Sequence, residues 1–401
     1  MSARVDVTRP APGGHALPAR FASTDAYGPR GRKRRTPVLV GVLSSALLVF
    51  AIITLQLIAN LGYDRTLDDF TDARASTQRT LVGAQEDVAE LAGTTDIAGR
   101  LVETDTGALV DPASRDALAA AVAEAADTTA TTETILGAQL PEAGPKPSVF
   151  WDLFATTTEL ENQADDLREL ADDIEDATPA VSDARTALTE SGVAVLGSAA
   201  GAASAFEAAH ISAKNDAVVA LRDAAGEASL VTTLDESAVA VLSSLQDAAS
   251  QVVSSEQVEL AEKAGPLQGV RLEIEAFARS LAPGVLLEFD WSPVVNNAGY
   301  NGSMGGLTTW WWDEPDRAVI QLSNSVAEQW PAERSRALVA HEVGHAISVK
   351  CEDMYDSTTQ DSIEKWATAW AISMGFSDDA NGVWAYGYPP QSYIDAAYGC
   401  R

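Results

Sequence analysis

The sequence predicts an α+β fold in which one transmembrane helix and a long α-helical segment precede a small C-terminal domain with a short sheet. Three observations support this prediction. Residues 36–63 contain no charged side chain. Residues 64–280 are rich in Ala, Asp, Glu, Thr, Leu and Val, and their apolar residues recur every three or four positions, as in amphipathic helices. Eight of the nine Trp and six of the eight Tyr follow residue 280, which indicates a compact domain over 281–401.

Residues 1–35 are rich in Pro, Gly, Ala and Arg and lack hydrophobic periodicity. This composition predicts a disordered tail. The tail carries eight Lys or Arg against two Asp, and its RGRKRR cluster (30–35) directly precedes the uncharged segment.

The uncharged segment predicts a transmembrane helix over residues 36–63. Its apolar part, Val38–Leu61, would span about 36 Å as a helix, enough to cross a bilayer. A cleaved signal peptide is the main alternative, but its apolar region is usually about 7–15 residues long and ends in a small-residue cleavage site.

The basic cluster keeps the N-terminus in the cytoplasm, so residues 64–401 are expected outside the cell. The Ala-, Asp- and Val-rich composition indicates a high-GC bacterium and hence a bacterial plasma membrane, crossed once.

The chain is strongly acidic, with 58 acidic and 27 basic residues and a formal net charge of −31. Phosphate backbones would be repelled by such a chain, so we expect no nucleic-acid partner.

Residues 64–280 are expected to form an extracellular α-helical stalk, as a bundle or antiparallel coiled coil. Helix breaks are predicted at Asp111-Pro112, Pro141–Pro147, Pro179 and Gly265-Pro266. Nothing in this segment has the spacing of metal ligands or a nucleophile. It therefore indicates a spacer or an interaction module, which could also support a homo-oligomer.

Residues 281–401 show the patterns of a small mixed domain. The elements expected are strands at 285–289 (VLLEF) and 317–323 (RAVIQLS), a turn region at 296–306, a helix from Pro331 to Lys350 and a helix at 362–375.

The only two cysteines, Cys351 and Cys400, fall in the part predicted to lie outside the cell. An even count in an oxidising compartment predicts one disulfide, with two unpaired thiols as the alternative. The disulfide would close a loop of about 50 residues and stabilise the fold by roughly 3–4 kcal/mol.

The segment HEVGH predicts a zinc site. On a helix, His341 and His345 lie one turn apart on the same side and can bind one ion. Glu342 is offset by about 100°, so it can reach a water on the ion and act as the general base. Two histidines that merely pack on one helix face are the alternative.

A third ligand is needed, and no histidine follows His345. HEVGH followed by a helical glutamate resembles the gluzincin branch of the zincin metallopeptidases, whose third zinc ligand comes from a later helix. The resemblance covers roughly residues 285–375 and implies a small zincin-like domain with Glu364 as that ligand. In thermolysin-like members an aspartate four residues past the glutamate orients a histidine ligand. This chain has Thr368 there, so its histidine must be oriented by a different group. Asp361 is the rival ligand, and the remaining acidic alternatives are Glu352, Asp353 and Asp356.

Other features that the resemblance implies are partly visible. Zincins place an edge strand before the metal helix, where an extended peptide binds, and RAVIQLS is expected to be that strand. Oxyanion stabilisation usually comes from a Tyr or His. The candidates here are Tyr355, Tyr386, Tyr388 and Tyr393. The WWW run (310–312) suits either a substrate cleft or core packing.

These inferences predict a membrane-anchored extracellular zinc peptidase that hydrolyses peptide bonds in a peptide or protein substrate. His341, His345 and Glu364 would hold Zn²⁺, and Glu342 would accept a proton from water. The alternative is a non-catalytic extracellular helical scaffold whose zincin-like domain binds metal or a partner without turnover.

Overall fold

The computed structural model describes the backbone of residues 36–401 and side chains from Val42 onward. The predicted disordered tail and its basic cluster lie outside the described residues. The described chain divides into two compact units. The first consists of the residues up to Asp68 together with Ala143–Glu161, and the second of Asp69–Glu142 with Asn162–Arg401.

The first unit contains the start of α1 (Thr36–Thr104) and the start of α3 (Phe150–Ala209). Large apolar side chains of α1 between Val42 and Leu61 are mostly exposed. By length and composition, two described helices could cross a membrane, namely α1 from Val42 onward and α3. The most apolar window of α1 is only 6% buried and that of α3 is 28% buried, so α1 has the larger unpartnered apolar surface.

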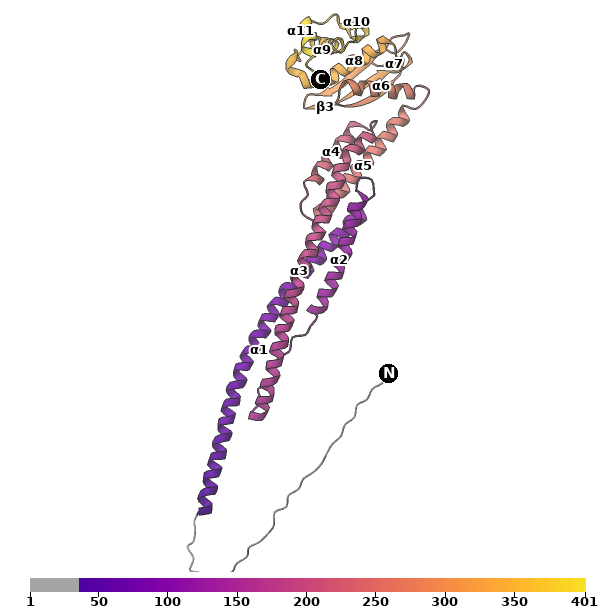
Figure 1. Ribbon diagram of the computed structural model, residues 1–401. Helices are drawn as coiled ribbons and strands as arrows, with labels where there is room; N and C mark the ends of the chain where they lie inside the picture. Colours follow the sequence, from indigo (N-terminus) through magenta and orange to yellow (C-terminus); the bar gives the residue numbers. More distant parts are fainter. Residues whose placement is uncertain (1–35) are drawn as a thin grey trace, which may run out of the picture. The chain divides into compact units, whose positions relative to one another are not determined.

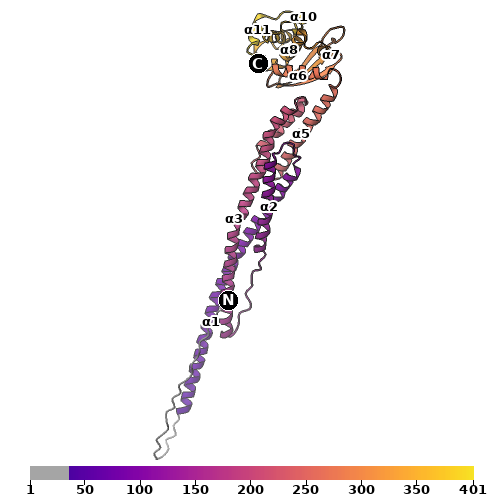
Figure 2. The same ribbon diagram turned by 45° about the vertical axis from the view of Figure 1, so that its right-hand side comes forward.

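The second unit contains a helical bundle built from the later parts of α1 and α3 with α2 (Pro112–Leu136), α4 (Asn215–Ser229) and α5 (Glu236–Glu262) (Figures 1 and 2). Buried residues of α3 recur every seven positions, at Ile174, Val181, Leu188 and Val195. This is the heptad spacing of coiled-coil packing. The prediction of a helical bundle is therefore confirmed.

Most predicted helix breaks are found. Asp111 caps α2 by accepting a hydrogen bond from the backbone N–H of Ser114, and Pro112 occupies the first turn. The predicted break at Pro179 is wrong, because Pro179 lies inside α3. A proline inside a helix costs about 3 kcal/mol. Burial of Ile174 and Val181 on either side of Pro179 offsets this cost.

The C-terminal part contains a three-stranded sheet in the order β1-β3-β2. Strand β1 (Leu286–Ser292) runs parallel to β3 (Glu314–Ser323), and β2 (Gly306–Trp311) runs antiparallel to β3. RAVIQLS is thus the central strand, and its prediction as the edge strand is wrong. Its alternating apolar residues show that one face is buried, but they do not reveal how many neighbours a strand has. Strands β1 and β2 form the two edges of the sheet.

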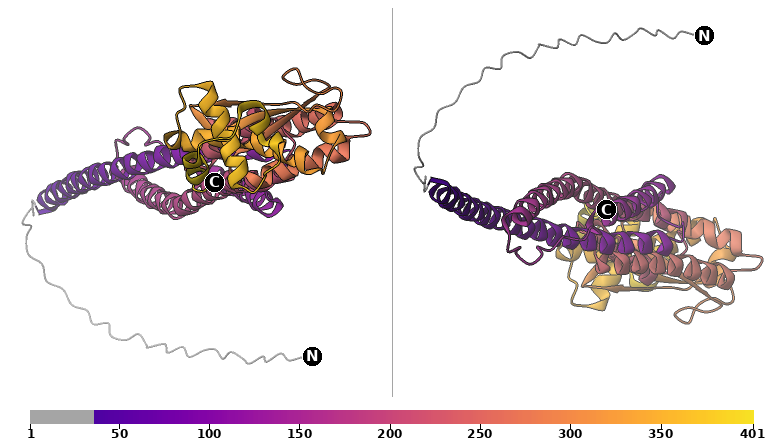
Figure 3. Two further views of the ribbon diagram at one scale, coloured as in Figure 1. Left: turned by 90° about the horizontal axis from the view of Figure 1, so that it is seen from above. Right: turned by 90° about the horizontal axis from the view of Figure 1, so that it is seen from below.

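Helices α6 (Gln268–Leu281), α7 (Asn324–Glu328) and α8 (Glu333–Ser348) pack with this sheet, and α9 (Gln360–Ser373) packs against α8 (Figures 1 and 3). Four short elements complete the domain: η1 (Val349–Met354), η2 (Asp379–Asn381), α10 (Val383–Tyr386) and α11 (Gln391–Ala397). Trp366 and Trp370, one turn apart on α9, are fully buried in the core. Burying a large apolar side chain stabilises by about 2–3 kcal/mol, so these two residues hold α9 firmly in place.

A disulfide joins Cys351 in η1 to Cys400, as predicted. Both residues are buried, and the indole N–H of Trp370 donates to the carbonyl of Cys400 at 2.9 Å. The bond ties the C-terminal segment to the turn that follows α8.

Polar contacts connect the bundle to the C-terminal domain. The side-chain amide of Asn215 donates to the carbonyl of Ala318 at 3.0 Å, and its backbone N–H donates to Glu288 at 2.8 Å. Nearby, the buried Lys263 pairs with Glu259 and Glu275. Such satisfied buried groups fix one arrangement of the elements that they join.

Candidate metal centre

Helix α8 carries the two histidines of HEVGH. Its second half is wholly buried, and His341 and His345 are 5% and 4% exposed. Gly344, between them, lies against α9. A Cβ atom there would come within 2.8 Å of the carbonyl oxygen of Ala367. Glycine therefore allows α9 to approach α8 closely enough for its side chains to meet the histidines.

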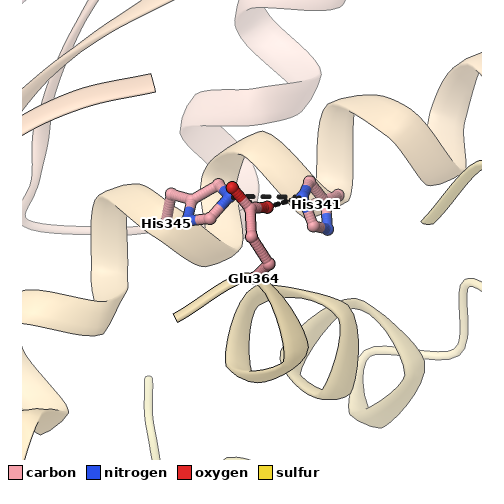
Figure 4. A group of neighbouring side chains, drawn as sticks. All are labelled: His341, His345 and Glu364. Atoms are coloured by element: carbon pink, nitrogen blue, oxygen red, sulfur yellow. Dashed lines mark hydrogen bonds and ion pairs between the residues drawn. The ribbon is translucent and has the colours of Figure 1, made fainter. Parts of the chain in front are cut away.

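Three side chains from the two helices converge on one point (Figure 4). Oε2 of Glu364 lies 3.2 Å from Nε2 of His341 and 3.1 Å from Nε2 of His345. The two histidine Nε2 atoms are 3.2 Å apart. Ligand atoms bound tetrahedrally to zinc at 2.0–2.1 Å lie about 3.3 Å from each other. The spacing of the three atoms thus fits a zinc-sized ion.

The protonation of His341 also fits a cation. Its Nδ1 lies 2.9 Å from the backbone carbonyl of Asn381, which can only accept a hydrogen bond, so Nδ1 carries the proton. Nε2 is then the nitrogen of His341 that can offer a lone pair, and it faces the Glu364 oxygen and His345. Electron-rich atoms that converge in this way require a metal ion or an extra proton between them. Together these residues could hold a metal.

Glu364 is held as a carboxylate. Burial alone would raise its pKa, but hydrogen bonds and charge from His341 and His345 outweigh burial and lower it. Its other oxygen, Oε1, accepts a hydrogen bond from the side-chain amide of Gln360 at 2.8 Å. The rival ligand Asp361 lies outside the cluster, since its side chain is 71% exposed and pairs with Lys365 at 2.8 Å.

The loop that contains η2 orients His341 through the Asn381 carbonyl. Asn381 is itself held, because its amide donates to the carbonyl of Phe376 at 2.8 Å. Gly382 follows with φ +106°, and a Cβ atom there would lie 2.6 Å from Nδ1 of His341 and would overlap the hydroxyl of Thr368. A backbone carbonyl thus takes the place that the aspartate has in the thermolysin-like pattern. Every residue type has a backbone carbonyl, so the sequence could not identify Asn381 as the hydrogen-bond partner of His341.

His345 is oriented by packing. Trp310, at the end of β2, stacks on its ring with a centroid distance of 5.2 Å and an interplanar angle of 6°. Its Nδ1 has no hydrogen-bond partner among the described residues. One tryptophan of the WWW run therefore contacts a predicted metal ligand.

Glu342 lies beside the cluster on α8 and is also buried. Its Oε2 accepts a hydrogen bond from the hydroxyl of Thr308 on β2 at 2.8 Å. Burial raises the pKa of Glu342 to about 6. A Cβ atom on Gly306 would lie 2.6 Å from the carboxyl carbon, so a larger residue there would displace the Glu342 side chain. The sequence patterns predicted a turn region up to Gly306 and no strand at β2, so neither Gly306 nor Thr308 was identified as a contact of Glu342.

Of the four candidate tyrosines, Tyr386 lies at the cluster. Its ring is nearly parallel to that of His341, with centroids 5.8 Å apart. Burial, together with the charges of Glu364 and Glu342, raises the pKa of Tyr386 to about 12. The others lie elsewhere: Tyr355 stacks on Trp366, Tyr393 hydrogen-bonds Ser362, and Tyr388 is 65% exposed.

The geometry therefore brings together His341, His345 and Glu364, with Glu342 and Tyr386 alongside. Comparison of the chain with protein-family models, with curated proteins and with solved structures found no match.

Proposed function

We propose that the chain is a membrane-anchored extracellular zinc peptidase of the gluzincin type. The observation that carries the proposal is the convergence of His341, His345 and Glu364 atoms within 3.2 Å of each other, next to the buried carboxylate of Glu342. A site that only bound metal would have no need of a buried carboxylate at this position. The resemblance of HEVGH and Glu364 to the gluzincin pattern supports the same function.

Zinc, when bound by these three residues, would polarise a peptide carbonyl and lower the pKa of a bound water to about 7. Glu342 is assigned the role of general base. Its pKa of about 6 leaves it ionised at neutral pH yet more basic than an ordinary glutamate, as a proton acceptor near pH 7 should be. The Thr308 hydroxyl fixes the orientation of its carboxylate.

Tyr386 is assigned the stabilisation of the oxyanion. With a pKa of about 12, its hydroxyl stays protonated at neutral pH and can donate a hydrogen bond. Donors aimed at developing negative charge are among the strongest contributions to catalysis.

The substrate class is a peptide or protein in extended conformation. Strand β2 is an edge of the sheet, and its residue Thr308 contacts Glu342 directly. An extended peptide can pair with an exposed strand edge through main-chain hydrogen bonds. We therefore assign the role of peptide-binding strand to β2 instead of to RAVIQLS.

The proposed location is a bacterial plasma membrane, crossed once by residues 36–63, with the C-terminal domain outside. The exposed apolar surface of α1 supports this helix as the membrane span. The corresponding uncharged stretch of α3, residues 191–206, contributes Val195, Leu196 and Ala199 to the bundle core, which favours a bundle helix. A disulfide suits the oxidising outer compartment.

The test combines metal content with peptide hydrolysis in the purified full-length protein. We expect one zinc per chain, which is lost in Glu364→Ala and retained in Glu342→Gln, while Glu342→Gln abolishes hydrolysis. Asp361→Ala is the matched control, because Asp361 lies on the same helix outside the cluster, and it should keep both zinc and activity. An active Glu342→Gln variant would refute the assigned base. Zinc without hydrolysis in the wild type would favour the scaffold alternative.

A further inference from the structure

Three aromatic residues open helix α3 in the first unit. The ring centroid of Phe150 lies 4.9 Å from that of Trp151 and 6.5 Å from that of Phe154. Trp151 is 59% exposed and Phe154 is 42% exposed. Contiguous exposed apolar side chains are a feature of protein and membrane interaction sites.

The chain that leads into this aromatic cluster runs beside the outer end of the apolar segment of α1. The side-chain amide of Gln56 donates to the carbonyl of Ser148 at 3.2 Å. Gln56 precedes Leu61, the last residue of the apolar run, by five positions, or about 7.5 Å along a helix. Phe150 follows Ser148 by only two residues, which span at most about 7 Å, so the aromatic cluster lies beside the last turns of the apolar run.

The surface of α1 beside Gln56 is apolar and exposed. Between residues 52 and 61, six large apolar side chains are 40–59% exposed, namely Ile52, Ile53, Leu55, Leu57, Ile58 and Leu61. The aromatic cluster therefore extends a surface that already has the character of a membrane span.

Polar groups limit how deep the aromatic cluster can lie. Asp152, within it, is exposed, and a carboxylate is strongly disfavoured in hydrocarbon. Just before the cluster, Lys146 pairs with Asp64 at 2.6 Å and lies over the ring of Tyr63. Aromatic side chains beside paired charges, at the end of an apolar helix, are typical of the water–lipid interface.

We propose that Phe150–Phe154 is a second membrane contact, in which Trp151 and Phe154 insert into the outer headgroup region of the bilayer that α1 spans. The proposal rests on the membrane anchor proposed above. The start of α3 is then fixed at the membrane surface independently of the covalent path through α1 and α2.

Site-specific fluorescence in lipid nanodiscs tests this. The two native cysteines form a disulfide, so a single introduced cysteine can be labelled with an environment-sensitive dye. Full-length Trp151→Cys, Leu57→Cys and Glu161→Cys proteins are labelled and placed in phosphatidylcholine nanodiscs, with and without lipid that carries a nitroxide near the headgroup. Leu57 reports on the α1 anchor. Glu161 is an exposed α3 residue about 15 Å from Trp151 along the helix, and it serves as the matched control.

The expected result is loss of dye emission at positions 57 and 151 and no loss at 161. Quenching at 57 without quenching at 151 would overturn the second contact and leave the anchor intact. Absence of quenching at 57 would overturn the anchor and, with it, this inference. Equal quenching at 151 and 161 would also overturn the inference, because the dye would then be reporting contact along the whole helix.

Discussion

The backbone carbonyl of Asn381 lies 2.9 Å from Nδ1 of His341, and the next residue, Gly382, packs against the same imidazole. The loop therefore decides which nitrogen of His341 is free to bind a metal. Partners of this kind typically change metal affinity by 10–100-fold when they are lost.

Gly382→Ala should weaken zinc binding roughly 10–100-fold, because the new Cβ atom pushes the loop away from His341. Competition with a chelating dye would measure the Kd. Gly375→Ala is the control, since Gly375 also has positive φ but nothing within 4 Å of its would-be Cβ atom. That variant should lose about 1–2 kcal/mol of stability and keep its zinc affinity. Equal affinities for the two variants would contradict the role of the loop.

Glu342→Gln should stabilise the metal-free protein at neutral pH. The folded-state pKa of Glu342 is about 6, above its ordinary value of 4.5. The stability that comes from its protonation is fully present below pH 4.5 and is lost as pH rises through about 6. The loss amounts to about 2 kcal/mol and is absent in the Gln variant. Urea unfolding of both proteins with a chelator, between pH 4.5 and 7.5, measures the difference. A difference that does not change with pH would contradict this account.

Tyr386→Phe should lower kcat by about 100–1,000-fold and leave KM and zinc affinity nearly unchanged, because it removes a donor to the oxyanion. Steady-state kinetics on a peptide substrate would show this. Tyr388→Phe is the control, since Tyr388 is 65% exposed and only two residues away. If both variants lose activity equally, Tyr386 is not the donor.

Replacing both cysteines, Cys351→Ala with Cys400→Ala, should destabilise the C-terminal domain by about 3–4 kcal/mol. The disulfide joins residues 49 positions apart, and its loss restores that loop entropy to the unfolded chain. Tryptophan fluorescence during denaturant unfolding reports on this domain, which holds eight of the nine Trp. Reduction of the wild-type disulfide should give the same shift. An unchanged midpoint in both experiments would show that the disulfide adds no stability.

Local patterns were enough to predict most of the helices, the disulfide and the pairing of His341 with His345, and the resemblance to the gluzincin pattern added Glu364. Each of these depends on residues within one helix or on very few candidate partners. The partners of the cluster were not predictable in the same way. Thr308 and Asn381 reach α8 from elements 34 and 40 residues away, and Asn381 acts through its backbone. Nothing in sequence periodicity specifies such long-range contacts.

The position of RAVIQLS shows a related limit. Alternation of apolar residues identified it as a strand, but strand order depends on which segments pair with it. Its neighbours are a parallel strand before it and an antiparallel strand that includes two of the three consecutive tryptophans. Similarly, a proline locally disfavours an α-helix, but Pro179 lies inside α3 because buried residues on both sides of it hold the helix in place.

The close crossing at Gly344 has a consequence for protein engineering. A Cβ atom there would meet both the carbonyl oxygen and Cα of Ala367 on the neighbouring helix, at 2.8 and 3.0 Å. Transplanting HEVGH into a foreign scaffold would therefore transfer two histidines and a glutamate without the tight helix contact that supplies the third ligand. A workable graft must carry α8 and α9 as one piece, with the small residues at their crossing kept unchanged.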